Sequence, residues 1–471
     1  MKTLPKAVCR LTSLTKLSLE NNRLTFFPPE FVSLQNLTQL TIRGNQFASL
    51  PPEIGMLTAL AKLNFDEAVV RNPPREIVVR GLTVTLAFLR QLCEARNSGK
   101  LVLRGLELST LEAGEIWRQT IITKDIKTFS LSRNAFMKMP SFIPALHHLE
   151  VLNFKGNQLS GLPVNIGELQ LLRKFQMSNN RVKSLPVSFA ELTALQILGL
   201  ASNEFNMVPP QIFNLPRLIR LDLSANVITT IPPDLGLLPC VQYVDVSRNQ
   251  LIEVAGGLGR AGSLLQLKLS YNMLETIPEE LGDLGLKSIL ELSHNKLVSL
   301  TKSVGRLTSL EVLLVDANCL VELPVDIGRL SLLNRLEIEN NSINVPPADV
   351  VAKGPAAVVD FMKKICDAES SFVLDLSYKS LRFLNPEVLT IKKLRSLNLS
   401  HNLLTELPEE IGRLTALTEL NVASNAMSSL PVAIHLLEKL VRLSLQGNRF
   451  ATLPAGVCVC MYVCVFARAR A

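Results

Sequence analysis

The sequence predicts an α/β solenoid, in which short repeated units stack side by side and each adds one strand to a parallel sheet. Three observations support this fold class. A unit of 23 residues recurs along most of the chain, its apolar positions keep a fixed spacing, and one asparagine marks the same place in each copy. In the central part of the chain this asparagine recurs without a slip at Asn134, Asn157, Asn180, Asn203, Asn226, Asn249, Asn272, Asn295, Asn318 and Asn341.

The unit LEVLNFKGNQLSGLPVNIGEL, which begins at Leu149, shows why the copies should stack. Leu152 and Phe154 fall on one face of a short strand, and Asn153 falls on the other. One apolar face of this size cannot stand alone, so neighbouring units bury a shared core. The asparagine side chain can satisfy backbone groups of the buried turn that follows the strand. This is the pattern of a leucine-rich repeat, and we expect a curved horseshoe with the parallel sheet on its inner face.

Two insertions interrupt the repeats and align with each other at a constant offset of 273 residues. They read PPREIVVRGLTVTLAFLRQLC from Pro73 and PPADVVAKGPAAVVDFMKKIC from Pro346. The spacing of their apolar residues predicts an amphipathic helix of about three turns in each copy. We expect both helices to be packed against the repeats and to bulge from the stack, with Phe88 and Phe361 buried.

These insertions define the expected domain organisation. N-terminal repeats, which begin in the middle of a unit, occupy 1–72, and helical insertions occupy 73–97 and 346–370. The central array occupies 98–345 and carries about five extra residues near 115–124, and the C-terminal repeats occupy 371–457. Ala68 and Lys379 stand where the repeat asparagine is expected.

The last residues, 458–471, differ in kind from the repeats. Valine alternates with cysteine and then alanine with arginine, as a translated dinucleotide repeat would read. We therefore interpret this tail as translated simple-sequence DNA. The alternative is a metal or palmitoylation site at Cys458, Cys460 and Cys464.

Composition favours a protein that neither binds nucleic acid nor spans a membrane. The net charge of +8 is spread along the repeats without a basic run, and the chain has one Trp and four Tyr. The remaining cysteines are widely spaced and do not flank the repeats in pairs, as is typical of a reducing compartment. The start of the chain lacks the apolar core of a signal peptide, and no apolar run reaches the length of a membrane span.

No motif predicts catalysis, a cofactor or a metal site. The run GLGRAG at 257–262 matches a glycine pattern of dinucleotide-binding sites. Such a site needs a strand before the glycines and a helix after them, whereas this run lies in the outer return of a repeat. We interpret it as a loosened turn. The five histidines do not gather with Cys, Asp or Glu at ligand spacing.

The candidate binding surface is the solvent-facing side of the predicted sheet. Two tyrosines lie there with an arginine nearby and carboxylates around them, as in an interface with an aromatic anchor and a polar rim. The candidate residues are Arg220, Asp222, Tyr243, Asp245, Lys268, Tyr271 and Glu291. The alternative is that these side chains only solvate a face that any such sheet must have.

The return LPxxIGxL in 23-residue units resembles the intracellular Ras-suppressor type of leucine-rich repeat. The insertion PPxxVVxKG with its following helix is similar to the lysine-glycine helix of the leucine-rich repeat-containing protein 40 family and of Roco-type proteins. The pairing of two insertions around a long array favours the former. The resemblance implies a cytoplasmic or nuclear interaction scaffold without enzymatic activity.

We expect this scaffold to be a monomer that binds an unidentified protein, such as a signalling protein, on its concave sheet face. The alternative is the sensor or substrate-binding region of a larger enzyme, such as a Roco-type kinase or a ligase, whose catalytic part lies outside this chain. A longer transcript that encodes a GTPase or kinase motif would favour the alternative.

Overall fold

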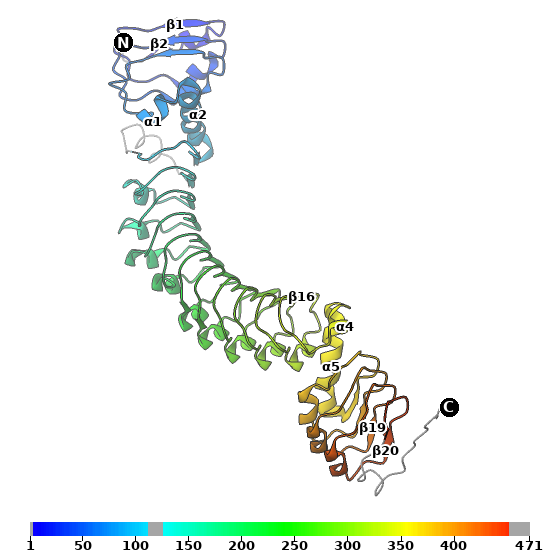
Figure 1. Ribbon diagram of the computed structural model, residues 1–471. Coiled ribbons are helices and arrows are strands. Elements are labelled where there is room, and N and C mark those ends of the chain that lie inside the picture. The colour runs from blue at the N-terminus through cyan, green and yellow to red at the C-terminus, as the bar shows by residue number, and fades with distance from the viewer. Residues whose placement is uncertain (1–2, 112–125, 452–471) are drawn as a thin grey trace. The chain divides into compact units, whose positions relative to one another are not determined.

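The computed structural model describes residues 3–111 and 126–451 (Figure 1). The chain divides into two compact units, and each is described by itself. The first unit comprises Met1–Ile228 and Leu238–Asn249, and the second comprises Thr229–Leu237 and Gln250–Ala471. The predicted extra residues near 115–124 and the cysteine-rich tail at 458–471 lie outside the described residues.

The first unit is built from parallel strands of three residues, one per repeat, with short 3-10 turns on the opposite side (Figure 1). In register, Val151 lies opposite Lys174 and Arg220 opposite Tyr243. The strands are β1 (Lys16–Ser18), β2 (Gln39–Thr41), β3 (Lys62–Asn64), β4 (Lys100–Val102), β5 (Thr128–Ser130), β6 (Val151–Asn153), β7 (Lys174–Gln176), β8 (Ile197–Gly199), β9 (Arg220–Asp222) and β11 (Tyr243–Asp245). The 3-10 turns are η1 (Val8–Arg10), η2 (Pro29–Ser33), η3 (Pro52–Met56), η5 (Ile143–Ala145), η6 (Ile166–Glu168), η7 (Val187–Glu191) and η8 (Pro210–Asn214).

The second unit repeats this architecture. Its strands are β13 (Gln266–Lys268), β14 (Ile289–Glu291), β15 (Val312–Leu314), β16 (Arg335–Glu337), β17 (Val373–Asp375), β18 (Ser396–Asn398), β19 (Glu419–Asn421) and β20 (Arg442–Ser444), with a short parallel pair of β10 (Thr230–Ile231) and β12 (Glu253–Val254). Its 3-10 turns are η9 (Pro233–Leu237), η10 (Gly256–Arg260), η11 (Glu279–Asp283), η12 (Lys302–Arg306), η13 (Val325–Arg329), η14 (Pro386–Thr390), η15 (Glu409–Arg413) and η16 (Val432–Leu436). The fold is a leucine-rich repeat solenoid with a parallel sheet, as the repeat pattern predicts. The glycine run at 257–262 forms and follows the outer turn η10, which confirms its interpretation as a turn.

The repeat asparagine joins neighbouring repeats through backbone groups. Asn226 is buried, and its Nδ2 donates to the carbonyl oxygens of Leu200 (3.1 Å) and Leu223 (2.9 Å). Its Oδ1 accepts from the backbone N–H of Phe205 (3.1 Å). Leu200 and Phe205 belong to the preceding repeat, so the Asn226 side chain satisfies buried backbone groups of two successive repeats.

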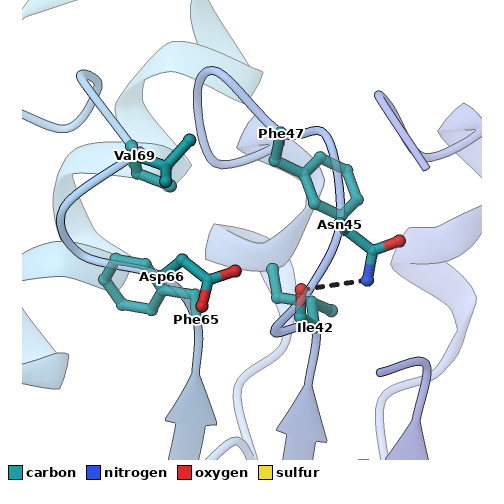
Figure 2. Close-up of a pocket in the computed structure, with 7 residues that line it drawn as sticks. Ile42, Asn45, Phe47, Phe65, Asp66 and Val69 are labelled. Atoms are coloured by element: carbon teal, nitrogen blue, oxygen red, sulfur yellow. Dashed lines mark hydrogen bonds between the residues drawn. The ribbon is translucent and has the colours of Figure 1, made fainter. Parts of the chain in front are cut away.

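The repeat asparagines and their hydrogen bonds form a ladder along the stack, and this ladder is interrupted where Ala68 replaces the asparagine. There, Val69 N–H and Val70 N–H both donate to the Asp66 carbonyl oxygen at 3.1 Å, so the chain forms a local turn instead. Figure 2 shows the cavity that results. It lies beside Asn45, the repeat asparagine that precedes the break, whose Nδ2 donates to the Ile42 carbonyl oxygen (3.0 Å). The cavity measures about 10 Å³ and is lined by Ile42, Asn45, Phe47, Phe65, Asp66, Val69 and Val70. It has room for about one water molecule, so we assign it to the break in the ladder and not to a ligand.

Each insertion forms a short helix followed by a long one. The pairs are α1 (Arg75–Val78) with α2 (Leu82–Ser98), and α4 (Ala348–Val351) with α5 (Pro355–Ser371). The prediction of about three turns was too short, because α2 and α5 have 17 residues each. Both helices continue beyond the apolar stripe that ends at Cys93 and Cys366, through mostly polar residues that periodicity alone could not include.

The long helices pack closely against the stack. Phe88 and Phe361 are fully buried, as predicted. As expected of packed helices, α2 packs directly on η3 and α5 packs directly on η13. A Cβ atom on Gly55 would lie 2.2 Å from Arg90 N, and one on Gly328 would lie 2.3 Å from Lys363 N. Only glycine permits these contacts, so each helix takes the place that the outer turn of a regular repeat would occupy.

Candidate functional site

The predicted binding positions lie on the solvent-facing side of the strands. In β9, Leu221 is fully buried while Arg220 is exposed and Asp222 is half-buried, and the same alternation holds in β11. Four of the candidates, Arg220, Asp222, Tyr243 and Asp245, belong to the first unit. The other three, Lys268, Tyr271 and Glu291, belong to the second unit.

In the first unit, the structure brings an arginine and a tyrosine together. Arg220 and Tyr243 are register partners on β9 and β11, and Arg220 Cζ lies 5.9 Å from the centre of the Tyr243 ring. A guanidinium at this distance is attracted to the ring face by about 0.5–1 kcal/mol at an exposed site. The pair is therefore partly ordered on the open face of the sheet before any partner binds.

The two aspartates beside this pair have a structural role. Asp222 Oδ1 accepts from the backbone N–H (3.1 Å) and the hydroxyl (2.7 Å) of Ser224. Asp245 Oδ1 accepts in the same way from Ser247, at 3.0 Å and 2.6 Å. These carboxylates hold the turn that follows each strand. A change such as Asp245→Lys would remove both hydrogen bonds to Ser247 and is therefore a poor probe of binding.

In the second unit, the candidates fall into two adjacent groups. Lys268 Nζ and Glu291 Oε2 form an ion pair at 2.9 Å. Tyr271 is 45% exposed, and its ring stacks on His294 with centroids 4.1 Å apart and planes 12° apart. His294 Nε2 in turn lies 3.9 Å from Asp316 Oδ2.

The sequence did not predict a place for His294 in this group. The available signal was the repeat itself, because His294 follows Tyr271 by one 23-residue unit. The same arrangement recurs at Tyr378 and His401, whose ring centroids lie 4.2 Å apart. All four residues adopt positive φ in the turn before the repeat asparagine or its replacement, so equivalent turns place the rings in register.

Neither a metal cluster nor an activated Cys93 thiol is found among the described residues. In 3–111 and 126–451, no group of three or more His, Cys, Asp or Glu side chains is placed to hold a metal ion. Cys93 is half-buried, and burial, with Glu53 nearby, raises the pKa of its thiol. A raised pKa disfavours the thiolate, which is the nucleophilic form. Within the same residues, no helix is long and apolar enough to cross a membrane.

Comparisons with known proteins agree with this fold. A family described as "Leucine rich repeat" matches residues 193–251 and 392–450, and a second family of the same description matches residues 13–34. No curated protein matches the chain.

Solved structures resemble the chain at low TM-score. A leucine-rich repeat protein of Leptospira interrogans is 26% identical, with 97% of this chain and 89% of that chain covered and a TM-score of 0.44. The plant peptide hormone receptor RGFR1, solved in complex with RGF2, is 21% identical, with 97% and 74% covered and a TM-score of 0.43. An internalin of Listeria monocytogenes is 21% identical, with 77% and 89% covered and a TM-score of 0.43. Likeness at this level carries no argument about partners.

Proposed function

We propose that the chain is a non-enzymatic scaffold that binds a partner protein on the strand-lined face. The observation that carries this proposal is the Arg220–Tyr243 pair, which lies half-open to solvent on two neighbouring strands. Tyrosine and arginine are enriched among the residues that dominate binding energy in protein interfaces. Neither ring nor guanidinium contributes to the buried core of the repeats, so their placement is free to serve recognition.

The scaffold acts as a monomer in the cytoplasm or nucleus, and its partner is a protein, such as a signalling protein. The widely spaced free cysteines Cys9, Cys93, Cys240, Cys319 and Cys366 support a reducing compartment. The resemblance to Ras-suppressor repeats and to the leucine-rich repeat-containing protein 40 family supports the same setting.

Tyr243→Ala tests the proposal. The Tyr243 side chain is half-buried against Arg220. Its loss should weaken the binding of a partner captured by pull-down by about 1–3 kcal/mol, without unfolding the first unit. Val187→Ala is the matched control, because Val187 is 84% exposed on η7, on the opposite side of the same unit. Unchanged affinity in Tyr243→Ala, together with a loss in Val187→Ala, would move the binding site to the outer turns.

A further inference from the structure

The strand face of the first unit carries a row of cations. The first residues of β4, β7 and β9 are Lys100, Lys174 and Arg220. In register, the half-buried side chains of Val151 and Ile197 lie between them on β6 and β8. Further exposed cations flank this row at the strand ends: Arg104, Arg133, Lys155 and Arg173. We call Lys100, Arg104, Arg133, Lys155, Arg173, Lys174 and Arg220 the cationic row.

The cationic row lacks internal counter-ions. In the part of the chain that the structure describes, none of its side chains lies within 4.0 Å of a carboxylate. Glu150, which directly precedes β6, is paired with Lys127 at 3.2 Å. The second unit differs. There, Lys268 pairs with Glu291, and Arg442 pairs with Glu419 at 2.8 Å. Arg335 pairs with Glu337, and Arg395 lies 5.7 Å from the Phe372 ring centre.

We propose that the cationic row binds an extended acidic segment of a partner protein. This inference rests on the proposed function and adds the chemistry of the partner. Clustered cations without counter-ions repel each other and favour the approach of an anionic partner. The apolar side chains of Val151 and Ile197 add non-polar contact between the charges. The segment that fits therefore presents both acidic and apolar side chains on the side that faces the sheet, where side chains two residues apart lie together.

The spacing of the row sets the length of this segment. Neighbouring strands lie about 4.8 Å apart, so the five steps from β4 to β9 span about 24 Å. An extended chain advances about 3.4 Å per residue, so about seven or eight residues cover the row. Arg220 and Tyr243 then lie at one end of the segment, where the ring offers an anchor.

A polypeptide fits this face better than a nucleic acid does. Single-stranded nucleic acids bind on grooves that combine cations with aromatic side chains on which the bases stack. From β4 to β9, the strand residues that face solvent include no aromatic side chain, and Tyr243 stands alone on β11. The apolar side chains of Val151 and Ile197, which lie between the cations, can contact apolar side chains of a peptide.

The test measures binding of a fluorescent peptide to the full chain by anisotropy. The probe alternates pairs of Glu with pairs of Val over about eight residues, the length that matches the row, so that either face of the extended peptide carries both side chains. We expect it to bind, and to bind more weakly as salt rises, because screening weakens attraction between exposed charges. The double variant Arg173→Glu with Lys174→Glu should lower its affinity about tenfold or more, and the same peptide with Lys in place of each Glu should not bind.

The control is a double variant with the same change in net charge away from the row. Lys138→Glu with Lys183→Glu alters two exposed lysines outside the strands and should change affinity little. Equal losses in both double variants would overturn the proposal, because binding would then reflect only net charge. Tighter binding of a uridine oligonucleotide than of the acidic peptide would also overturn it. If the peptide fails to bind while Tyr243→Ala still weakens binding of the captured partner, only this inference fails and the proposed function stands.

Discussion

Replacing Phe361 with alanine is expected to lower the free energy of unfolding of the second unit by about 3–5 kcal/mol, the range for a buried phenylalanine. Phe361 is fully buried on α5, which packs on η13 so closely that Gly328 has no room for a side chain. The surrounding backbone therefore cannot collapse to fill the cavity. The shift in the urea unfolding midpoint measures the effect.

Phe383→Ala is the control for this experiment, because Phe383 belongs to the same unit and is 47% exposed. It should shift the midpoint much less. Equal shifts for the two variants would mean that α5 is not an integral part of the stack.

Replacing Asn226 with alanine should lower the free energy of unfolding of the first unit by about 1–3 kcal/mol, the penalty for leaving buried polar groups without a partner. The change removes the donors to the Leu200 and Leu223 carbonyl oxygens and the acceptor for Phe205 N–H. The urea midpoint should fall and the unfolding transition of the first unit should broaden, because the lost bonds join two repeats.

Asn206→Ala is the comparison for the ladder experiment. Asn206 is exposed and lies in the repeat that precedes Asn226, in the same unit. If the two substitutions had the same effect, the ladder asparagines would not be the structural elements that we describe.

The ladder was predictable from the sequence because its chemistry is local. Each repeat asparagine must meet the same backbone groups, so its spacing cannot drift, and strand register follows from it. The burial of Phe88 and Phe361 was also predictable, since an apolar stripe on a helix must face the core. The ends of α2 and α5 were not, because polar residues such as Glu94 carry no periodic signal.

The candidate site was predicted only in part. Register identified Arg220 and Tyr243 as neighbours, since parallel strands align equivalent residues. The roles of Asp222 and Asp245 depend on hydrogen bonds to the serine two residues later, and the only sequence signal for them is the repeated Asp-x-Ser pattern. The Tyr271–His294 stack depends on side-chain direction in a left-handed turn, which residue spacing alone does not specify.

Site-specific photo-crosslinking tests the central claim most directly. A photoreactive benzoylphenylalanine at position 243 places the probe on the strand face, and the same probe at position 187 places it on η7. If the strand face binds the partner, position 243 should yield a discrete crosslinked protein and position 187 should not. Crosslinks from position 187 alone would contradict the account and assign binding to the outer turns.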